Sequence, residues 1–403
     1  MLACVSQIVL FLELVSCISI PPQGNSLNLA PAPHHVALSK HRRQETLSRK
    51  SFNKRSNSTL IRPTGANLQY AVEVKFNGVP RYLLLDTGSS DTWMFGHDFQ
   101  CLSNTSCNTG PRYTGEIDRI PGEAFNIVYG NNENITGQVG YADVSVAGLS
   151  VENQVVSVVT EGYWQGDGVL SGVLGVGSYG LTSAFEEANP NELRQYSPVF
   201  ESMYNKTGQI DPVFSLALQR GDDAGYLAFG GLPPVDVEHD FASTKIVGVP
   251  FGKKREDRPF YAIENFGVEL NGKTHNQSFQ AVVDSGTYPN RFPAAVADKI
   301  NAAFKPPAVY IEEYGAYAVP CNATAPDLGI AIGGKIFYMH PTDMFVPIGQ
   351  DGICTTSIYR GFDLDPSLYP DGLYILGDVF LHNVVAVYDI GNEQIHFAPH
   401  NDY

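Results

Sequence analysis

Long apolar segments are rare in this 403-residue chain. Beyond residues 4–12, no stretch is long and apolar enough to span a membrane, and the carboxyl end carries no apolar anchor signal. We therefore expect no membrane anchor. Charged residues are also few, at 17%, whereas Gly, Pro, Tyr and Phe are abundant. This composition argues against a disordered chain or a coiled coil and favours a turn-rich, mainly β globular protein.

Cysteine is scarce as well, with six residues in the whole chain. Two lie in the N-terminal apolar segment, and four follow in the body of the chain: Cys101, Cys107, Cys321 and Cys354. Their spacing lacks paired Cys-x-x-Cys knuckles, so a zinc site is disfavoured. Two local disulfides are the simplest interpretation, although four cysteines permit three pairings.

The N-terminal region predicts a secretory route. Residues 1–20 are similar to a signal peptide, although Glu13 interrupts the apolar run, and a frayed N-terminal helix is the alternative. Six sequences match the Asn-X-Ser/Thr acceptor of N-linked glycans, at Asn57, Asn104, Asn134, Asn205, Asn276 and Asn322. We expect a protein that is secreted to the extracellular space or, alternatively, delivered to a vacuole.

A basic leader precedes an acidic body. Residues 1–55 hold seven Lys and Arg against two Glu, although the whole chain has a net charge of −16. Residues 21–55 have no sustained periodicity and depend on the body for any order. They end at the dibasic pair Lys54-Arg55. The leader is either a solvated tail or a pro-segment that docks on the acidic body.

Short strands separated by Gly, Asn and Pro recur through the body, which is typical of antiparallel β-structure. Residues 70–76 and 81–85 predict a hairpin around Asn77-Gly78. The best helix candidates are residues 180–206 and 293–304.

An internal repeat indicates two related lobes. An apolar strand, Asp-Ser/Thr-Gly and a later apolar pair before Gly occur twice, in residues 83–88 with 173–175 and again in residues 281–286 with 375–377. We therefore assign residues 56–236 to an N-terminal lobe and residues 237–403 to a C-terminal lobe.

The sequence Asp-Ser/Thr-Gly occurs only at Asp86 and Asp284. Each carboxylate follows a strand of buried type, which costs free energy unless the charge is used or paired. If the lobes face each other, the two carboxylates meet and share one proton. One can then act as a base toward a water molecule while the other, as an acid, hydrogen-bonds a substrate carbonyl.

The residues next to the two aspartates are expected to support this pair. Gly88 and Gly286 allow the backbone to approach closely. Four hydroxyls are placed to hold the carboxylates in one geometry, at Thr87, Ser89, Ser285 and Thr287.

The segment Asp86-Thr-Gly-Ser-Ser90, followed by Trp93, and the segment Asp284-Ser-Gly-Thr287 resemble the two active-site signatures of the pepsin family of aspartic proteases, of the secreted fungal type. The resemblance covers about residues 68–398. It implies an all-β, mainly antiparallel, bilobal acid-protease fold with a few short helices. It also implies an endopeptidase with an acid optimum that prefers apolar residues around the scissile bond, and disulfides within both body cysteine pairs.

The same resemblance implies a flap that begins at Tyr129 and Gly130 and closes over the substrate, with Tyr129 hydrogen-bonded to Trp93. It places a hydrophobic cleft wall at Leu84, Trp93, Tyr129, Trp164 and Leu170, residues that could otherwise be core. Two departures stand out. The flap tip, residues 131–136, is longer than usual, and Tyr288 occupies the place of a small hydroxyl residue.

Rival functions lack sequence support. Residues 175–180 match a dinucleotide fingerprint, but no βαβ alternation surrounds them. A Gly-x-Ser-x-Gly elbow and a His-Glu-x-x-His pair are both missing. A non-catalytic binder that kept the fold is the remaining alternative.

Because one chain supplies both aspartates, we expect a monomer rather than a half-enzyme that must dimerise. The expected partners are protein or peptide substrates, pepstatin-type inhibitors and the chain's own pro-segment. Neither nucleic acid, nor a cofactor, nor a metal is expected.

Overall fold

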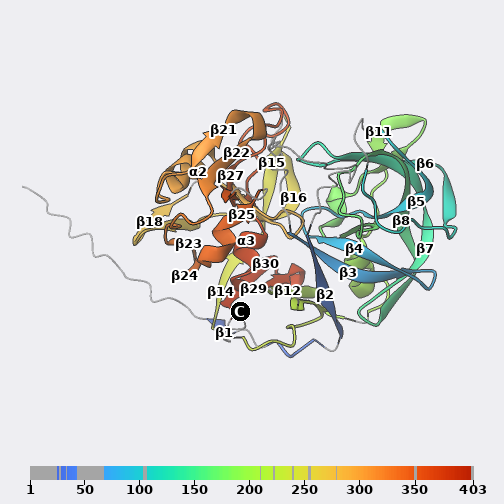
Figure 1. The fold of residues 1–403 in the computed structure, drawn as a ribbon. Coiled ribbons are helices and arrows are strands. Elements are labelled where there is room, and N and C mark those ends of the chain that lie inside the picture. Colours follow the sequence, from blue (N-terminus) through green and yellow to red (C-terminus); the bar gives the residue numbers. More distant parts are fainter. Residues whose placement is uncertain are drawn as a thin grey trace, which may run out of the picture.

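The computed structural model describes most of the chain. The described residues are 25–26, 29–32, 34–42, 68–102, 107–208, 210–220, 223–237, 240–252, 256–277, 279–348 and 352–400. Strands dominate them, in agreement with the expected mainly antiparallel all-β fold (Figure 1). The signal sequence expected in residues 1–20, the Lys54-Arg55 pair, Asn57 and Asn104 lie outside the described residues. The other four glycosylation candidates are exposed: Asn134, Asn205, Asn276 and Asn322.

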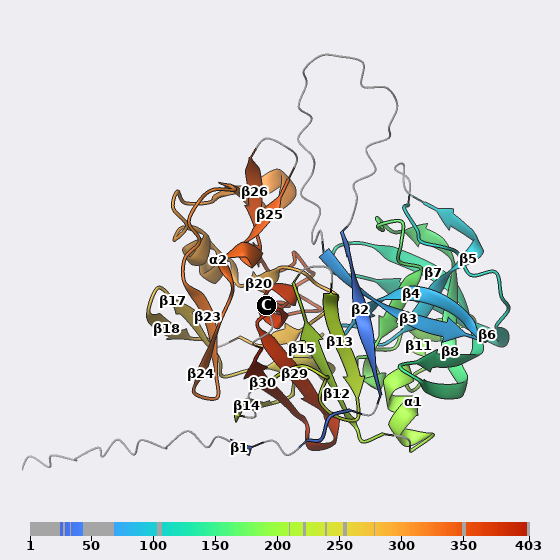
Figure 2. The same ribbon diagram turned by 60° about the horizontal axis from the view of Figure 1, so that its bottom comes forward.

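One long sheet runs from the N-terminal lobe into the centre of the molecule. In hydrogen-bonded order its strands are β1 (Asn25–Ser26), β14 (Asp240–Lys245), β30 (Gln394–Pro399), β29 (Val384–Asp389), β12 (Val213–Leu218), β13 (Asp223–Phe229), β2 (His34–Arg42), β3 (Leu68–Phe76), β4 (Val79–Asp86), β9 (Gly172–Gly175), β5 (Thr92–Cys101), β8 (Leu149–Tyr163), β7 (Asn134–Val146), β6 (Asp118–Val128), β10 (Ala184–Glu186) and β11 (Asn189–Leu193). Figure 2 shows β2, β13, β12 and β29 side by side between the two halves.

Three smaller sheets build the opposite half, drawn in yellow to red in Figure 1. The first contains β15 (Val247–Phe251), β16 (Glu256–Ile263), β19 (Ala281–Val283), β28 (Ile375–Leu376), β20 (Asn290–Phe292) and β27 (Ile358–Arg360). The second contains β18 (Lys273–Asn276), β17 (Gly267–Leu270), β23 (Leu328–Ile332) and β24 (Lys335–Tyr338). The third contains β21 (Val309–Ile311), β22 (Ala316–Pro320), β26 (Ile353–Thr356) and β25 (Phe345–Pro347).

The two halves share their central strands. β12 pairs with β13 on one side and with β29, from the end of the chain, on the other. Phe214 of β12 lies opposite Tyr388 of β29, and the two rings stack with centroids 4.4 Å apart, both fully buried. The last strands of the chain therefore return to the middle of the molecule and join its two halves.

Helices are short among the described residues. They are α1 (Val199–Asn205), α2 (Ala294–Asn301) and α3 (Asp378–Leu381), with 3-10 turns η1 (Tyr179–Leu181), η2 (Glu312–Tyr314), η3 (Pro341–Met344) and η4 (Ile390–Asn392). The helix predicted over residues 293–304 is present as α2. The helix predicted over residues 180–206 is wrong except for α1, because β10 extends the sheet edge at β6 and forms a hairpin with β11. Residues 184–193 therefore form strands because they pair with a strand from an earlier part of the chain.

The hairpin predicted from Asn77-Gly78 is present. Asn77 and Gly78 have positive φ angles of 48° and 81°, which suit a tight two-residue turn between antiparallel strands. β4 is exposed on alternate residues near the turn and fully buried over its last four residues. The strand therefore enters the core as it reaches Asp86.

Both expected disulfides are present, Cys101–Cys107 and Cys321–Cys354. The paired cysteines are 6 and 33 positions apart in the sequence, and each pair lies within one half of the molecule. No helix among the described residues has the length and apolar character needed to cross a membrane.

Candidate active site

Two equivalent strands deliver the aspartates. β4 ends at Asp86 and pairs in parallel with β9, so that Leu84 faces Val173 and Asp86 faces Gly175. β19 leads to Asp284 and pairs in parallel with β28. The internal repeat in the sequence is therefore a repeat of one structural unit, in which an apolar strand before Gly supports each aspartate.

Crossed hydrogen bonds join the two loops. The Thr87 hydroxyl donates to the Val283 carbonyl at 2.9 Å and accepts from the Ser285 N–H at 3.0 Å. The Ser285 hydroxyl donates to the Leu85 carbonyl at 2.9 Å and accepts from the Thr87 N–H at 3.3 Å. Because all four bonds are buried, they fix the relative position of the two loops.

Each carboxylate is held by its own loop. One Asp86 oxygen accepts from the Gly88 N–H at 2.8 Å, and the other accepts from the Ser89 hydroxyl at 2.5 Å. Asp284 has the same arrangement, with the Gly286 N–H at 2.8 Å and the Thr287 hydroxyl at 2.7 Å. Both aspartates are nearly buried, at 5% and 6% exposure.

The glycines bring each carboxylate against the opposite loop. A Cβ placed on Gly88 would lie 2.7 Å from Oδ1 of Asp284, and one on Gly286 would lie 2.5 Å from Oδ1 of Asp86. Both distances are shorter than a van der Waals contact, so these positions need glycine. The two carboxylates therefore meet, as the sequence predicts.

Their proximity affects ionisation. Burial and the neighbouring Asp284 charge raise the pKa of Asp86 well above its ordinary value, against the opposing effect of the hydrogen bonds from Ser89 and Gly88. This pair therefore holds a proton to a higher pH than an isolated aspartate would.

The flap residues lie over the pair. Tyr129 follows β6, and its hydroxyl accepts a hydrogen bond from the Trp93 indole N–H at 2.8 Å. Trp164 packs edge-on against both rings, at 5.1 Å from Trp93 and 5.8 Å from Tyr129. The Tyr129 N–H donates to the Glu133 carbonyl at 2.8 Å, so the tip of the hairpin is a tight turn.

A cleft at the aspartates is formed by both halves. From the N-terminal half it is lined by Gln69, Leu84, Asp86, Gly88, Tyr129, Gly130, Asn131, Glu133 and Trp164, and from the C-terminal half by Asp284, Gly286, Thr287, Tyr288, Pro289, Arg291, Phe362, Leu373 and Ile375. Trp93 and Leu170, expected in the cleft wall, are instead core residues at 0% and 1% exposure that do not line this cleft.

Several lining residues were not predicted from the sequence. Arg291 and Ile375 lie close to the second signature and its supporting segment, so their positions in the sequence could have drawn attention to them. Phe362 and Leu373 carry no such signal, because a long connection brings them to the cleft. Tyr288, the residue that departs from the family signature, is 3% exposed, and its hydroxyl lies 3.5 Å from the Asp343 carbonyl. Thr287 makes the hydrogen bond to Asp284 that the sequence analysis assigned to it.

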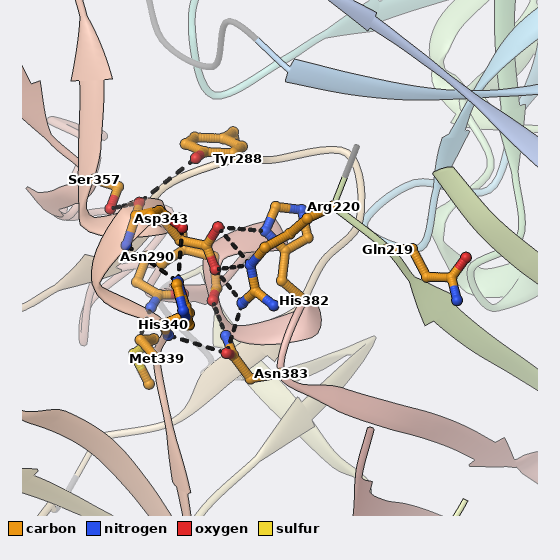
Figure 3. Close-up of polar contacts among 12 residues, drawn as sticks. Gln219, Arg220, Tyr288, Asn290, Met339, His340, Asp343, Ser357, His382 and Asn383 are labelled. Carbon is orange, nitrogen blue, oxygen red and sulfur yellow. Dashed lines mark hydrogen bonds and ion pairs between the residues drawn. The ribbon is translucent and has the colours of Figure 1, made fainter. Parts of the chain in front are cut away.

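A buried polar cluster lies beneath the second loop (Figure 3). The guanidinium of Arg220 binds Asp343 through Nε, at 2.9 Å from each carboxylate oxygen, and also through Nη2, which further donates to Asn383 at 2.7 Å. His382 lies 3.3 Å from the same carboxylate and 2.5 Å from the Tyr70 hydroxyl. The cluster links β3, the end of β12 and the C-terminal half.

The ionisation of Asp343 is set by these partners. Burial raises its pKa, but hydrogen bonds from His382 and Arg220 outweigh burial and lower the pKa to about 2. The ion pair therefore stays charged in moderately acidic solution.

Comparison with known proteins identifies the class. The family model of eukaryotic aspartyl proteases matches residues 69–400, and the chain belongs to this family. It is an aspartic-type endopeptidase, a hydrolase with a pepsin-like fold.

Individual proteins similar to this chain are also aspartic proteases. A probable aspartic-type endopeptidase of Aspergillus fumigatus is 38% identical over 365 residues, which cover 85% of this chain and 81% of that protein. Cathepsin E of Mus musculus is 29% identical over 331 residues, 79% of this chain and 76% of that protein. The crystal structure of an aspartic proteinase from Irpex lacteus superposes with a TM-score of 0.65 at 20% identity, covering 83% of this chain and 95% of that one, which shows the shared fold.

Proposed function

We propose that Asp86 and Asp284 share one proton and together activate a water molecule that attacks the peptide carbonyl. The observation that supports this most is the mirrored arrangement of the two loops, in which each carboxylate accepts a backbone N–H on Oδ1 and a hydroxyl on Oδ2. These donors hold both carboxylates in matching orientations, and both carboxylates line the cleft.

In this mechanism the ionised carboxylate takes a proton from water while the protonated one hydrogen-bonds the carbonyl oxygen. The water oxygen bonds to the carbonyl carbon as the protonated carboxyl gives its proton to the carbonyl oxygen, which yields a tetrahedral diol without a covalent enzyme intermediate. The diol then collapses: the C–N bond breaks, one diol hydroxyl returns its proton to the ionised carboxylate, and the leaving nitrogen takes up the proton of the other carboxyl. The pair returns to its singly protonated state.

An acid optimum follows from the charges of the pair. Hydrolysis requires one proton on the two carboxylates, and burial next to a like charge raises the pKa at which that proton is lost. Activity rises as pH falls until this form is populated and declines when the second carboxylate is protonated.

We further propose that the substrate binds in the cleft with apolar side chains beside the scissile bond. Leu84 and Trp164 on one half and Leu373 and Ile375 on the other provide apolar surface next to the pair. Burying a well-fitted apolar side chain contributes about 1.5 to 3 kcal/mol.

The N-terminal leader is proposed to act as a pro-segment. β2 lies inside residues 21–55 and fills a place in the central sheet between β13 and β3, with Val36 opposite Leu227 and Ser39 opposite Ala71. Backbone hydrogen bonds of this kind bind the leader to the body, in addition to the attraction between its basic residues and the acidic body. We also propose that residues 1–20 are a signal peptide and that residues 56–236 and 237–403 form the two catalytic lobes. The proposed enzyme is a monomer that is either secreted or delivered to a vacuole.

The proposal is tested by measuring hydrolysis of a peptide library from pH 2 to pH 8, with and without pepstatin. We expect pepstatin-sensitive cleavage between apolar residues with a maximum in acid. Cleavage that is insensitive to pepstatin, or maximal above pH 7, would contradict the proposed mechanism.

A further inference from the structure

Arg291 places a basic side chain in a cleft lined otherwise by apolar, neutral polar and acidic residues. It lies in β20, opposite Ile375 of β28 and Tyr359 of β27, and it lines the same cleft as Asp86 and Asp284. Nothing in the proposed hydrolytic mechanism uses its charge.

Aromatic rings hold the guanidinium in place. Its central carbon lies 3.8 Å from the centre of the Phe362 ring and 5.3 Å from that of Tyr359. Nη1 donates to the Arg360 carbonyl at 3.1 Å. Stacking on a ring fixes the plane of a guanidinium but leaves its edge donors available for a ligand.

The hydrogen-bonding capacity of Arg291 is only partly used. Its Nε is buried without a hydrogen-bond partner, and no carboxylate among the described residues forms an ion pair with it. The neighbouring Arg360 differs, because its guanidinium binds Asp298 at 2.9 Å and 3.1 Å. A cation without an anionic partner in a buried setting is costly.

Burial also lowers the pKa of Arg291, to about 10. The side chain therefore remains a cation throughout the acid and neutral range. The flap lies close to the ring that carries it, since a Cβ placed on Gly130 would approach Cε2 of Phe362 to 2.8 Å. A group bound at Arg291 would thus lie next to the flap, where the peptide passes.

We propose that Arg291 binds a carboxylate of the substrate and gives the enzyme a preference for acidic peptides. This inference rests on the proposed binding of peptides in the cleft. A carboxylate matches the guanidinium edge with charge-assisted, two-pronged hydrogen bonds. The carboxylate is either a Glu or Asp side chain near the scissile bond or the C-terminal carboxylate of the peptide.

The test uses acid-treated protein expressed from the full chain. Peptides share one apolar scissile pair and blocked ends, and a single Glu or Gln is moved through the positions on both sides of the bond. A second pair of peptides differs only in a free or amidated C-terminus. We measure kcat/KM at pH 5, where a Glu side chain is mostly ionised, and at pH 3, where it is mostly protonated.

At pH 5 we expect about a tenfold or greater advantage of Glu over Gln at one position, as for a hydrogen bond to a charged group. At pH 3 the ratio of kcat/KM for the Glu peptide to that for the Gln peptide falls toward one. Arg291→Met, which keeps the stem on Phe362, removes the advantage of Glu, and Arg291→Glu reverses it in favour of Gln. The control Arg360→Gln, which also removes one positive charge, retains it. An advantage only for the free C-terminus identifies the terminal carboxylate as the source.

The assignment would be overturned if the charged and neutral peptides of every pair had equal kcat/KM, or if the advantage of the charged peptide survived in Arg291→Met. A second experiment measures binding of fluorescently labelled versions of these peptides to the Asp284→Asn variant. Because it needs no cleavage, it tests the role of Arg291 independently of the hydrolytic mechanism. Tighter binding of the acidic peptides without cleavage by the unmodified enzyme would contradict the proposed function and support the role of Arg291. Equal binding would contradict the role of Arg291 alone.

Discussion

The ion pair of Arg220 with Asp343 should make the enzyme stable in acid, and Asp343→Asn tests this. Asp343 has a side-chain exposure of 7% and a pKa of about 2, against an ordinary value of 3.8. A depressed carboxyl pKa adds stability that is fully present above the unfolded value and is lost as pH falls through the folded value. At 1.36 kcal/mol per pKa unit, the difference corresponds to about 2 kcal/mol.

The variant loses this contribution and also leaves Arg220 without its carboxylate. Removing one partner of a buried ion pair typically costs about 3 to 5 kcal/mol. The assay measures the free energy of unfolding of both proteins in urea at pH 6, 4, 3 and 2, with circular dichroism as the signal. Other carboxylates titrate in the same range, so the difference between the two proteins is the relevant quantity. We expect this difference to be constant from pH 6 to pH 4 and to shrink by about 2 kcal/mol between pH 4 and pH 2.

Two results would refute this reasoning. A loss below about 1 kcal/mol at pH 6 would mean that the pair is no stronger than an exposed ion pair. A difference that stays constant down to pH 2 would mean that Asp343 does not have a depressed pKa.

Other predictions concern the cleft and the leader. Gly286→Ala should lower kcat at least about 100-fold with little loss of secondary structure, because the new Cβ would lie 2.5 Å from Oδ1 of Asp86 and shift a group that must be positioned closely; unchanged kcat would show that the loops can separate freely. Tyr129→Phe, which removes the acceptor of the Trp93 indole N–H, should reduce kcat/KM about tenfold without changing the melting temperature; a matching fall in melting temperature would indicate a structural role instead. A full chain with Lys54-Arg55 replaced by Ala should be inactive at pH 6 to 7 beside a chain beginning at residue 56, and equal rates on one peptide would return the leader to a sorting or folding role.

Local motifs were sufficient to predict that the two aspartates meet, each held by its own glycine and hydroxyl. Each aspartate, its glycine and its supporting hydroxyl lie within four consecutive residues, and the repeat relates the two sets. The pairing of β4 with β9 and of β19 with β28 could also be anticipated, because each later segment repeats the same short pattern.

Features that depend on distant parts of the chain could not be predicted. Arg220 and Asp343 are 123 residues apart, and no pattern in the sequence connects them. The hairpin of β10 and β11 replaces an expected helix because its partner is β6, earlier in the chain. Trp93 and Leu170 were assigned to the cleft wall although they lie behind it, since apolar side chains suit a core and a cleft equally well.

The central claim is that both carboxylates act as one unit, and it is tested by comparing Asp86→Asn and Asp284→Asn. The measurement is kcat for one blocked peptide at the pH optimum, together with circular dichroism spectra to confirm the fold. Removing either member of a unit should cost about as much as removing both, so we predict similar losses in the two single variants and in the double variant. Near-normal turnover by either well-folded single variant would contradict the account.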